Sequence, residues 1–127
     1  MDAFRQKSSS AIIAVSDIER ARGFYGEVLG LESETGTMPG VLVYRTGSTR
    51  LVIYSSDVAG TNRANAVVWD CGEDIEAIAA ALAARGVTFE RYEMEGVRFR
   101  DGVHDAGGFR MVWFKDPDGN ILHLTSA

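Results

Sequence analysis

An internal repeat constrains the fold of this chain more than any other feature. The tripeptide Asp17–Glu19 (DIE) opens an apolar pattern with helical spacing, and the same tripeptide opens a second pattern at Asp74–Glu76. Gly30 and Gly86 follow the two patterns in the C′ position, where glycine commonly ends a helix. One strand-like run precedes each helical pattern and further runs follow it. A repeat of this kind predicts two similar β-α-β-β-β modules.

The first half of the repeat is predicted to begin with a strand at Ser10–Val15. The S-x-x-E spacing of Ser16–Glu19 is that of a capping box, so we expect a helix to start there. Apolar residues at helical spacing then form one face of this helix. They are Ile18, Ala21, Tyr25 and Val28, and the strands predicted to follow are Leu31–Glu34, Val41–Thr46 and Arg50–Ser55, with a turn around Gly36–Gly40 between the first two.

The second half restarts the pattern with a strand predicted at Ala64–Asp70 and an alanine-rich helix at Ile75–Arg85. The segment Glu93–Gly108 has no counterpart in the first half and is predicted to be a long loop. Loops of that length in a compact domain are usually functional or mobile, so we expect a role for it. The stripe of the helix is Ile75, Ile78 and Leu82, and the remaining predicted strands are Val87–Tyr92, Phe109–Phe114 and Ile121–Thr125.

These patterns divide the chain into four parts that together make one α+β domain. Residues 1–9 are predicted to be a polar arm and residues 10–56 the first module. Residues 57–63 form a polar connector, and residues 64–127 form the second module. A chain of 127 residues can bury about two-thirds of its unfolded surface, so a hydrophobic core needs no disulfide or metal.

The last hairpin is the clearest local signal in the sequence. Two apolar runs flank Asp116–Asn120 (DPDGN), whose proline and glycine favour a tight turn. If Trp113 lies opposite His123 across this turn, then Met111, Trp113 and His123 share one face of the sheet, because side chains alternate along a strand. The sequence alone leaves open whether that face is a site or a core.

Composition excludes several classes of protein. The net charge of −5 argues against a nucleic-acid partner, which usually requires a basic face. The single cysteine, Cys71, excludes an intrachain disulfide and fits a reducing compartment. The polar first ten residues lack the apolar region of a signal peptide, and the apolar run Ala77–Ala84 is too short to cross a bilayer. We therefore expect a cytoplasmic protein with no membrane or nucleic-acid partner.

The chain resembles the vicinal oxygen chelate superfamily, which includes glyoxalase I, bleomycin and fosfomycin resistance proteins and extradiol dioxygenases. The resemblance rests on the two modules, on the first helix (VSDIERARGFYGEVLGLE) and on the last hairpin (FKDPDGNILHL), and it runs from Ser10 to Thr125. It implies cupped mixed sheets, a ligand cavity between them and a homodimer.

The resemblance also implies where a metal would be bound, on the first and last strands of each module. The corresponding positions are Ser10, Val52, Ala66 or Val67, and His123. Only His123 carries a side chain suited to a transition metal, whereas zinc, iron and nickel sites need three or four converging ligands. We therefore predict no metal ligands and no cofactor.

Aromatic and polar-tipped residues on the strands, together with one histidine in the long segment, are predicted to line a ligand cavity. Flat aromatic walls with a few polar groups suit a planar ligand. Core packing is the alternative role for each strand residue, and an exposed loop position is the alternative for His104. The predicted ligand-binding residues are Tyr44, Tyr54, Trp69, His104, Met111, Trp113 and His123.

The sequence therefore predicts a protein that binds a small organic ligand in an aromatic-lined cavity without a metal. One alternative is a metal-dependent glyoxalase-like lyase, isomerase or dioxygenase, in which His123 and groups such as His104 would hold the ion. Another is a metal-free enzyme that uses His123 as its acid or base, since an ordinary histidine titrates near neutral pH.

Overall fold

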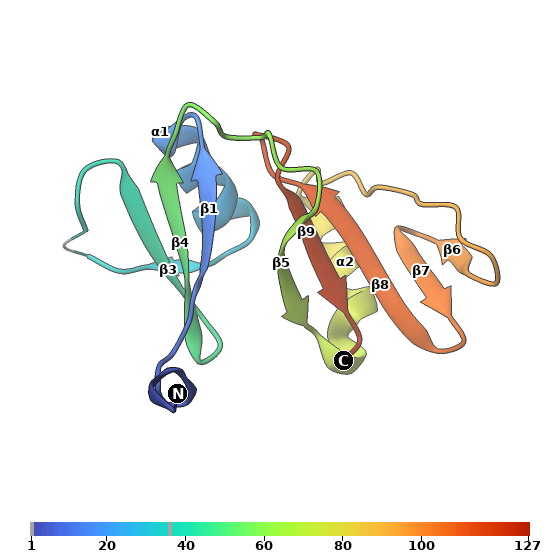
Figure 1. Ribbon diagram of the computed structural model, residues 1–127. Coiled ribbons are helices and arrows are strands. Elements are labelled where there is room, and N and C mark those ends of the chain that lie inside the picture. The colour runs from blue at the N-terminus through green and yellow to red at the C-terminus, as the bar shows by residue number, and fades with distance from the viewer. Residues whose placement is uncertain (1, 36) are drawn as a thin grey trace. The chain divides into compact units, whose positions relative to one another are not determined.

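The structure, a computed structural model, describes residues 2–35 and 37–127. Met1 and Gly36, which fall in the predicted polar arm and in the predicted turn before Val41, lie outside the described residues. The chain divides into two compact units, Met1–Ala59 and Gly60–Ala127 (Figure 1). The division falls inside the predicted connector, residues 57–63, and each unit is described by itself.

The first unit is a four-stranded mixed sheet with helical turns on one face (Figure 1). Its strand order is β1-β4-β3-β2, with β1 parallel to β4 and the other neighbours antiparallel. The described part of the polar arm contains the 3-10 turn η1. The elements are η1 (Ala3–Gln6), β1 (Ala11–Val15), α1 (Ile18–Ala21), η2 (Arg22–Val28), β2 (Glu32–Ser33), β3 (Val41–Thr46) and β4 (Thr49–Ser55).

The first helix begins at the predicted place but with a different cap. Asp17, not Ser16, is the N-cap residue, and its carboxylate accepts a hydrogen bond from the backbone N–H of Arg20 at 3.0 Å. After one α-helical turn the chain widens into the π-helix η2, which buries Phe24 and Tyr25. Gly30 follows with a φ of 73°, a left-handed conformation that glycine adopts without strain, so the helix ends where the sequence predicts.

The second unit is a five-stranded mixed sheet with α2 against one face (Figure 1). Its strand order is β5-β9-β8-β7-β6, and the first and last strands of the unit, β5 and β9, are parallel neighbours, as β1 and β4 are in the first unit. The elements are β5 (Asn65–Asp70), η3 (Gly72–Asp74), α2 (Ile75–Ala84), β6 (Arg98–Arg100), β7 (Val103–Ala106), β8 (Phe109–Lys115) and β9 (Ile121–Thr125).

The prediction for residues 87–108 is wrong in two respects. Val87–Tyr92 does not form a strand, since only Phe89 makes an isolated bridge, to Phe114. Glu93–Gly108 is not a continuous loop, because β6 and β7 pair as a hairpin. The turn between them is Asp101-Gly102, with φ values of 51° and 85°, the left-handed pair that a tight hairpin requires. Gly102 also packs directly on the Phe89 ring, where a Cβ atom would overlap it.

The last hairpin forms as predicted, and Asp116 organises its turn. This residue is 4% exposed, and its carboxylate accepts hydrogen bonds from the backbone N–H of Asp118 at 3.0 Å and of Asn120 at 2.8 Å. The side-chain amide of Asn120 donates a third, at 2.8 Å. Gly119 supplies the positive φ, 88°. The turn sets the register that places Trp113 opposite His123, which confirms the predicted pairing.

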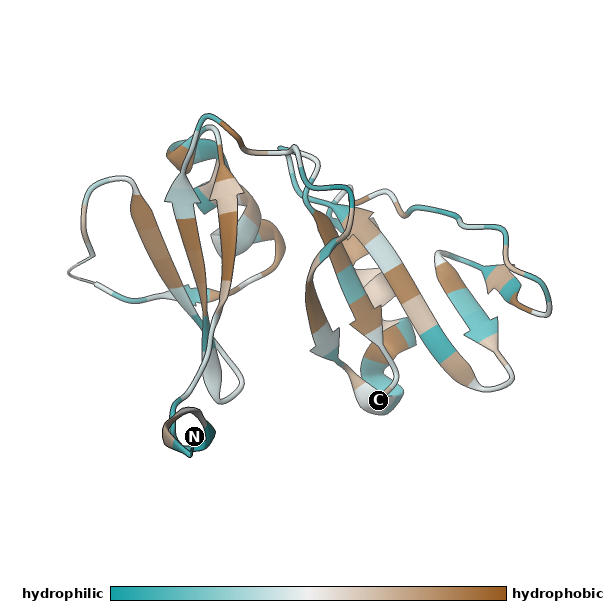
Figure 2. Ribbon diagram, viewed as in Figure 1, coloured by the Kyte–Doolittle hydropathy of each residue, from teal (hydrophilic) through white to brown (hydrophobic). Residues whose placement is uncertain are grey.

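Within the described residues, each sheet has one face packed on helix and one face that the helices of its unit leave open. Polar residues interrupt the apolar ones along β7, β8 and β9 (Figure 2). The helix face of the first unit buries Ile13, Val15, Leu42, Leu51 and Ile53, and that of the second buries Val112, Phe114, Leu122 and Leu124 against Ile75, Ala79 and Leu82 of α2. The predicted α+β class, with two modules built on mixed sheets, is confirmed.

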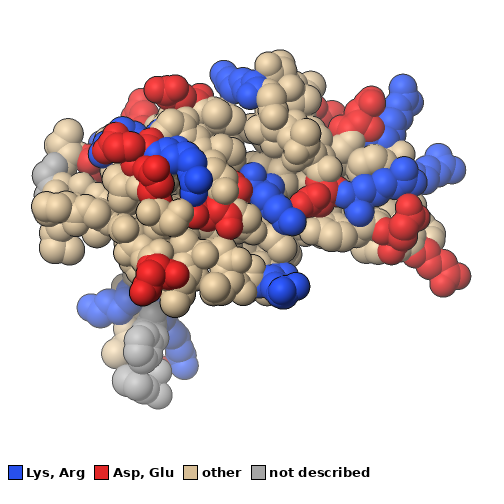
Figure 3. Space-filling view, turned by 90° about the horizontal axis from the view of Figure 1, so that it is seen from above, with Lys and Arg blue, Asp and Glu red and all other residues tan. Residues whose placement is uncertain are grey.

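Two surface properties bear on partners. None of the described helices is long and apolar enough to cross a membrane. On the face drawn in Figure 3, basic and acidic side chains are interspersed and do not gather into patches of one sign. The absence of a nucleic-acid partner stays a prediction from the net charge.

Candidate functional site

Four of the predicted ligand-binding residues lie together on the open face of the second sheet. The strand register puts His104 of β7 beside Met111 of β8, and Trp113 of β8 beside His123 of β9. Directly opposed residues of antiparallel strands share a face, so all four side chains project away from α2. We call this set, with Tyr92 and Phe99 added below, the aromatic cluster.

His123 stacks on Trp113 in the centre of the cluster. The ring centroids are 4.4 Å apart and the planes differ by 16°. Nδ1 of His123 lies 3.0 Å from the carbonyl oxygen of Val112. A carbonyl can only accept, so Nδ1 carries the proton of the neutral imidazole and Nε2 keeps a lone pair. The strand backbone therefore fixes one tautomer, whose Nε2 can accept a hydrogen bond or a proton.

His104 is fully buried within the cluster. Its Nε2 accepts a hydrogen bond from the backbone N–H of Tyr92 at 2.9 Å, so Nδ1 carries the proton in the neutral ring. Among the described residues Nδ1 has no hydrogen-bond partner, although the nearby Met111 backbone favours the charged form. Burial, with a smaller contribution from Arg91, lowers the pKa of His104. This histidine is therefore held neutral near physiological pH.

Two members of the cluster were missed in the sequence. Tyr92 meets Trp113 edge to face at 5.1 Å, and Phe99 of β6 meets His104 at 4.8 Å. The guanidinium carbon of Arg91 lies 4.8 Å from the centre of the Phe99 ring. The Asp-Gly turn after Arg98–Arg100 was the available signal, because a hairpin there sends Phe99 to one face and its two arginine neighbours to the other.

The other three predicted residues lie elsewhere. Tyr44 is 1% exposed on the helix face of the first sheet, 6.2 Å from Tyr25 between ring centroids, and burial raises its pKa. Tyr54 pairs with Val41 and Ala14, and so lies on the open face of the first sheet. Trp69 pairs with Leu124, which places it on the helix face of the second sheet. The structure therefore gathers four of the seven, and the role of every one of them in binding stays a prediction.

The positions implied for a metal do not bring a ligand set together. Val52 pairs with Ile12 on the first sheet, and Val67 pairs with Leu122 on the helix face of the second. His123 offers a single nitrogen, Nε2, because Nδ1 is hydrogen-bonded to the Val112 carbonyl oxygen. Within the described residues there is no group of three or more His, Cys, Asp or Glu side chains arranged to hold an ion. The residues present do not fit the three or four ligands of a transition-metal site.

Cys71 lies at the end of β5 and has no feature of a nucleophile. It is partly buried, and burial followed by the charge of Asp70 raises the pKa of its thiol. A raised pKa keeps the thiol protonated near neutral pH. This agrees with its interpretation as a packed small residue.

The stability of the second unit is expected to fall as the pH drops below about 6.5, the ordinary pKa of histidine. The folded unit lowers the pKa of His104, so the unfolded chain binds this proton more readily. The stabilising contribution is therefore complete above about pH 6.5 and is lost below it, by about 1.4 kcal/mol for each unit by which the pKa is lowered. Urea unfolding at pH 7.5 and 5.0, followed by tryptophan fluorescence, measures it.

His104→Gln should flatten this pH dependence, because glutamine has no group that titrates in this range. Both tryptophans, Trp69 and Trp113, lie in the second unit, so their fluorescence reports the unfolding of that unit. Equal pH slopes in the wild type and His104→Gln would contradict the assignment.

The family model of the Glyoxalase/Bleomycin resistance protein/Dioxygenase superfamily matches residues 7–124. No curated protein matches the chain.

Three solved structures illustrate the likeness of the fold. A glyoxalase family protein from Enterococcus faecalis is 26% identical with a TM-score of 0.69, covering 96% of this chain and 98% of that one. A fosfomycin resistance protein from Listeria monocytogenes, in complex with Mn(II) and a dihydroxypropylphosphonic acid, is 16% identical with a TM-score of 0.71, covering 96% and 90%. Lactoylglutathione lyase from Agrobacterium tumefaciens is 18% identical with a TM-score of 0.64, covering 94% and 92%. The chain belongs to the glyoxalase/bleomycin resistance protein/dioxygenase superfamily, the vicinal oxygen chelate family that its first helix and last hairpin resemble.

Proposed function

We propose that the protein binds a small organic ligand on the open face of the second sheet, without a metal held by the protein. The observation that carries this proposal is the near-parallel stack of Trp113 on His123, on the face of the sheet opposite α2. Flat aromatic surface combined with one free imidazole nitrogen suits a planar ligand that carries a hydrogen-bond donor. The Listeria relative, which holds a small organic acid together with Mn(II), supports a small-molecule ligand for this fold.

Trp113→Ala is expected to weaken binding of such a ligand at least tenfold, because stacking on an aromatic ring and the area it buries contribute about 1.5 kcal/mol or more. Aromatic and antibiotic-like compounds, bleomycin and fosfomycin included, would be screened by thermal shift. Hits would then be titrated into the wild type and into Trp113→Ala by isothermal titration calorimetry, which needs no tryptophan as a reporter.

Trp69→Phe is the matched control, because this residue lies on the other face of the same sheet. Compounds that bind the wild type should bind this variant with unchanged affinity. A ligand that keeps its affinity in Trp113→Ala and loses it in Trp69→Phe would overturn the proposal.

A second candidate is a metal-free enzyme in which His123 is the acid or base. The fixed tautomer favours it, since Nδ1 is tied to the Val112 carbonyl and Nε2 keeps its lone pair. A substrate whose turnover follows a single ionisation and is lost in His123→Gln, while its binding persists, would support the enzyme over the binding protein.

The metal-dependent alternative is tested separately. Protein purified without chelators would be analysed for bound metal. A stoichiometric ion that is lost in His123→Ala would overturn the metal-free proposal, whereas an ion retained in that variant would leave His123 outside the metal site.

We also propose that the protein is a cytoplasmic homodimer. The open face of the first sheet exposes apolar side chains, among them Ile12, which is 63% exposed and lies beside Val52. Such a surface is commonly covered by another chain or a ligand. Sedimentation velocity over a range of concentrations tests the dimer, and a monomer at all of them would refute it.

A further inference from the structure

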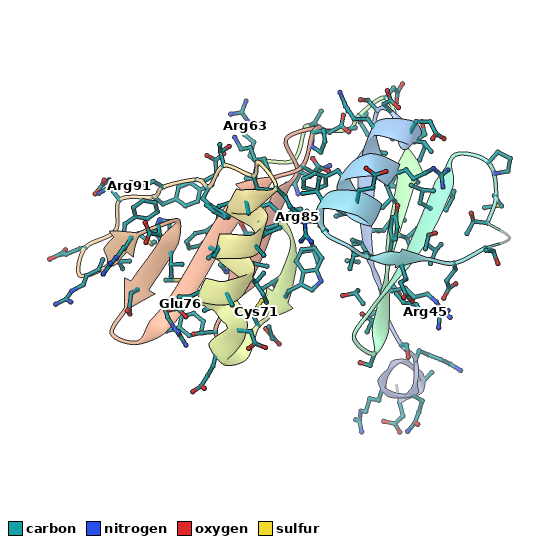
Figure 4. All side chains as sticks on the ribbon, turned by 180° about the vertical axis from the view of Figure 1, so that it is seen from behind. Arg45, Arg63, Cys71, Glu76, Arg85 and Arg91 are labelled. Carbon is teal, nitrogen blue, oxygen red and sulfur yellow. The ribbon has the colours of Figure 1, made fainter. Side chains whose placement is uncertain are left out.

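A groove opens on the helix face of the second unit, away from the aromatic cluster. Seen from the helix side, α2 lies over β8 and β9, whereas β7 and β6 extend past it (Figure 4). The groove beside α2 has a volume of about 920 Å³. Its apolar lining is formed by Ala79, Ala80 and Ala83 of α2 and by Val87, Phe89 and Val103.

Strand β6 supplies the cationic side of this groove. The register pairs Arg98 with Asp105 and Arg100 with Val103, so both arginines share the groove face, and Phe99 between them faces the aromatic cluster. Both arginines line the groove. The hairpin that completes the cluster on one face therefore also presents two guanidinium groups on the other.

The acidic residues of the groove are mostly engaged by other partners. Glu76 forms an ion pair with Arg110, and the Asp105 carboxylate accepts a hydrogen bond from the backbone N–H of Gly108 at 2.7 Å. Asp101 lies 3.7 Å from Arg100, but both side chains are at least 90% exposed, so this pair contributes little and is easily exchanged. Arg98 has no ion pair with any described residue.

We propose that this groove binds an aliphatic carboxylate. Its hydrocarbon chain lies along the alanines of α2 and the Phe89 ring, and its carboxylate pairs with Arg98 and draws Arg100 away from Asp101. Two features carry this assignment together. Ala80 and Ala83 of α2 leave exposed apolar surface beside the sheet, and Arg98, which lines the groove, has no ion-pair partner among the described residues. Guanidinium groups bind carboxylates through paired hydrogen bonds.

An uncharged or cationic ligand fits less well. An alcohol of the same length would cover the same apolar surface but leave the Arg98 guanidinium without a counter-charge. A cation would meet two arginines, and the nearby carboxylates of Glu76 and Asp105 are already bonded. This site is independent of the proposed function, because its lining residues lie on the helix face and the cluster lies on the other.

The test is a titration of the full chain, labelled with ¹³C at the alanine methyl groups, with octanoate. Saturable shifts are expected for the methyl groups of Ala79, Ala80 and Ala83. Arg98→Gln should raise the octanoate Kd about tenfold, the usual scale for a charged hydrogen-bonded pair. Ala80→Glu, at an exposed helix position that tolerates glutamate, should abolish the shifts by placing a carboxylate in the groove. Octanol should bind at least tenfold more weakly than octanoate.

Matched variants locate the binding site in this groove. Arg85→Gln removes a cation from the opposite side of α2 and should leave the Kd unchanged (Figure 4). Asp105→Asn keeps an oxygen for the Gly108 N–H while removing a negative charge beside Arg98, so it should lower the Kd. Trp113→Ala should have no effect, which distinguishes this site from the ligand site on the other face.

The proposal is overturned by any of three results. They are the absence of saturation, equal affinity for octanol and octanoate, and octanoate shifts that survive Ala80→Glu in a variant with wild-type circular dichroism.

Discussion

Replacing Asp116 by alanine is expected to lower the free energy of unfolding of the second unit by about 3 kcal/mol. The carboxylate accepts hydrogen bonds from the backbone N–H groups of Asp118 and Asn120 and from the Asn120 amide, inside a turn where Asp116 is 4% exposed. Alanine offers no acceptor, so these hydrogen bonds would be lost from a turn in which Asp116 and Asn120 are both buried. Urea unfolding followed by tryptophan fluorescence measures the change.

Asp116→Asn is the control for this result. Its amide oxygen can still accept the backbone hydrogen bonds of the turn, but its NH₂ group replaces the oxygen that faces the Asn120 amide. We therefore expect a decrease in the free energy of unfolding that is smaller than in Asp116→Ala. A loss below about 1 kcal/mol in Asp116→Ala would show that the turn is held by its glycine and proline geometry and not by the carboxylate network.

Gly60→Ala is expected to destabilise the second unit by a similar amount. Gly60 has a φ of 76°, and a Cβ atom there would overlap the backbone carbonyl of Asp118. The left-handed conformation costs alanine about 1 kcal/mol or more, and relief of the overlap requires movement of a backbone that the Asp116 network holds in place. We expect a total of about 3 kcal/mol, measured by the same urea titration.

Gly96→Ala separates the two contributions. Gly96 has nearly the same φ, 74°, and its Cβ would meet no atom within 4 Å. Gly96→Ala should therefore lower the free energy of unfolding only by the cost of the left-handed conformation. If Gly60→Ala and Gly96→Ala lower the free energy of unfolding equally, the backbone around Gly60 shifts without cost and the contact with Asp118 has no stabilising role.

The features that sequence reasoning located correctly are those with local causes. The Asp116–Asn120 turn depends on residues a few positions apart, and it joins β8 to β9 in the register that places Trp113 opposite His123. The helix ends also have a local cause, because Gly30 and Gly86 adopt a positive φ there. Alternation along the strands then placed Met111, Trp113 and His123 on one face without any knowledge of the rest of the sheet.

The features that sequence reasoning missed depend on contacts between residues distant in sequence. Trp69 follows an irregularity between Asn65 and Val67, and its face is set by where β5 joins β9, which no local pattern specifies. Tyr44 is on the helix face because β3 pairs with β4 in a register that aligns it with Leu51. The aromatic cluster needed Phe99, whose strand was hidden because arginines flank it and its turn lies in a charged segment.

The parallel pairing of the first and last strands of each module has a consequence for synthesis on the ribosome. Ala11 lies beside Leu51, and Asn65 beside Ile121, so each module closes its sheet only when its final strand is available. During translation of the second module, the backbone of β5 has no strand partner until α2, β6, β7, β8 and finally β9 have been synthesised. Such non-local closure is slow relative to helix formation, and it leaves strand edges open to other chains in the meantime. A nascent chain halted before Ile121 would therefore be prone to aggregate, whereas one that includes Thr125 could fold in a single cooperative step.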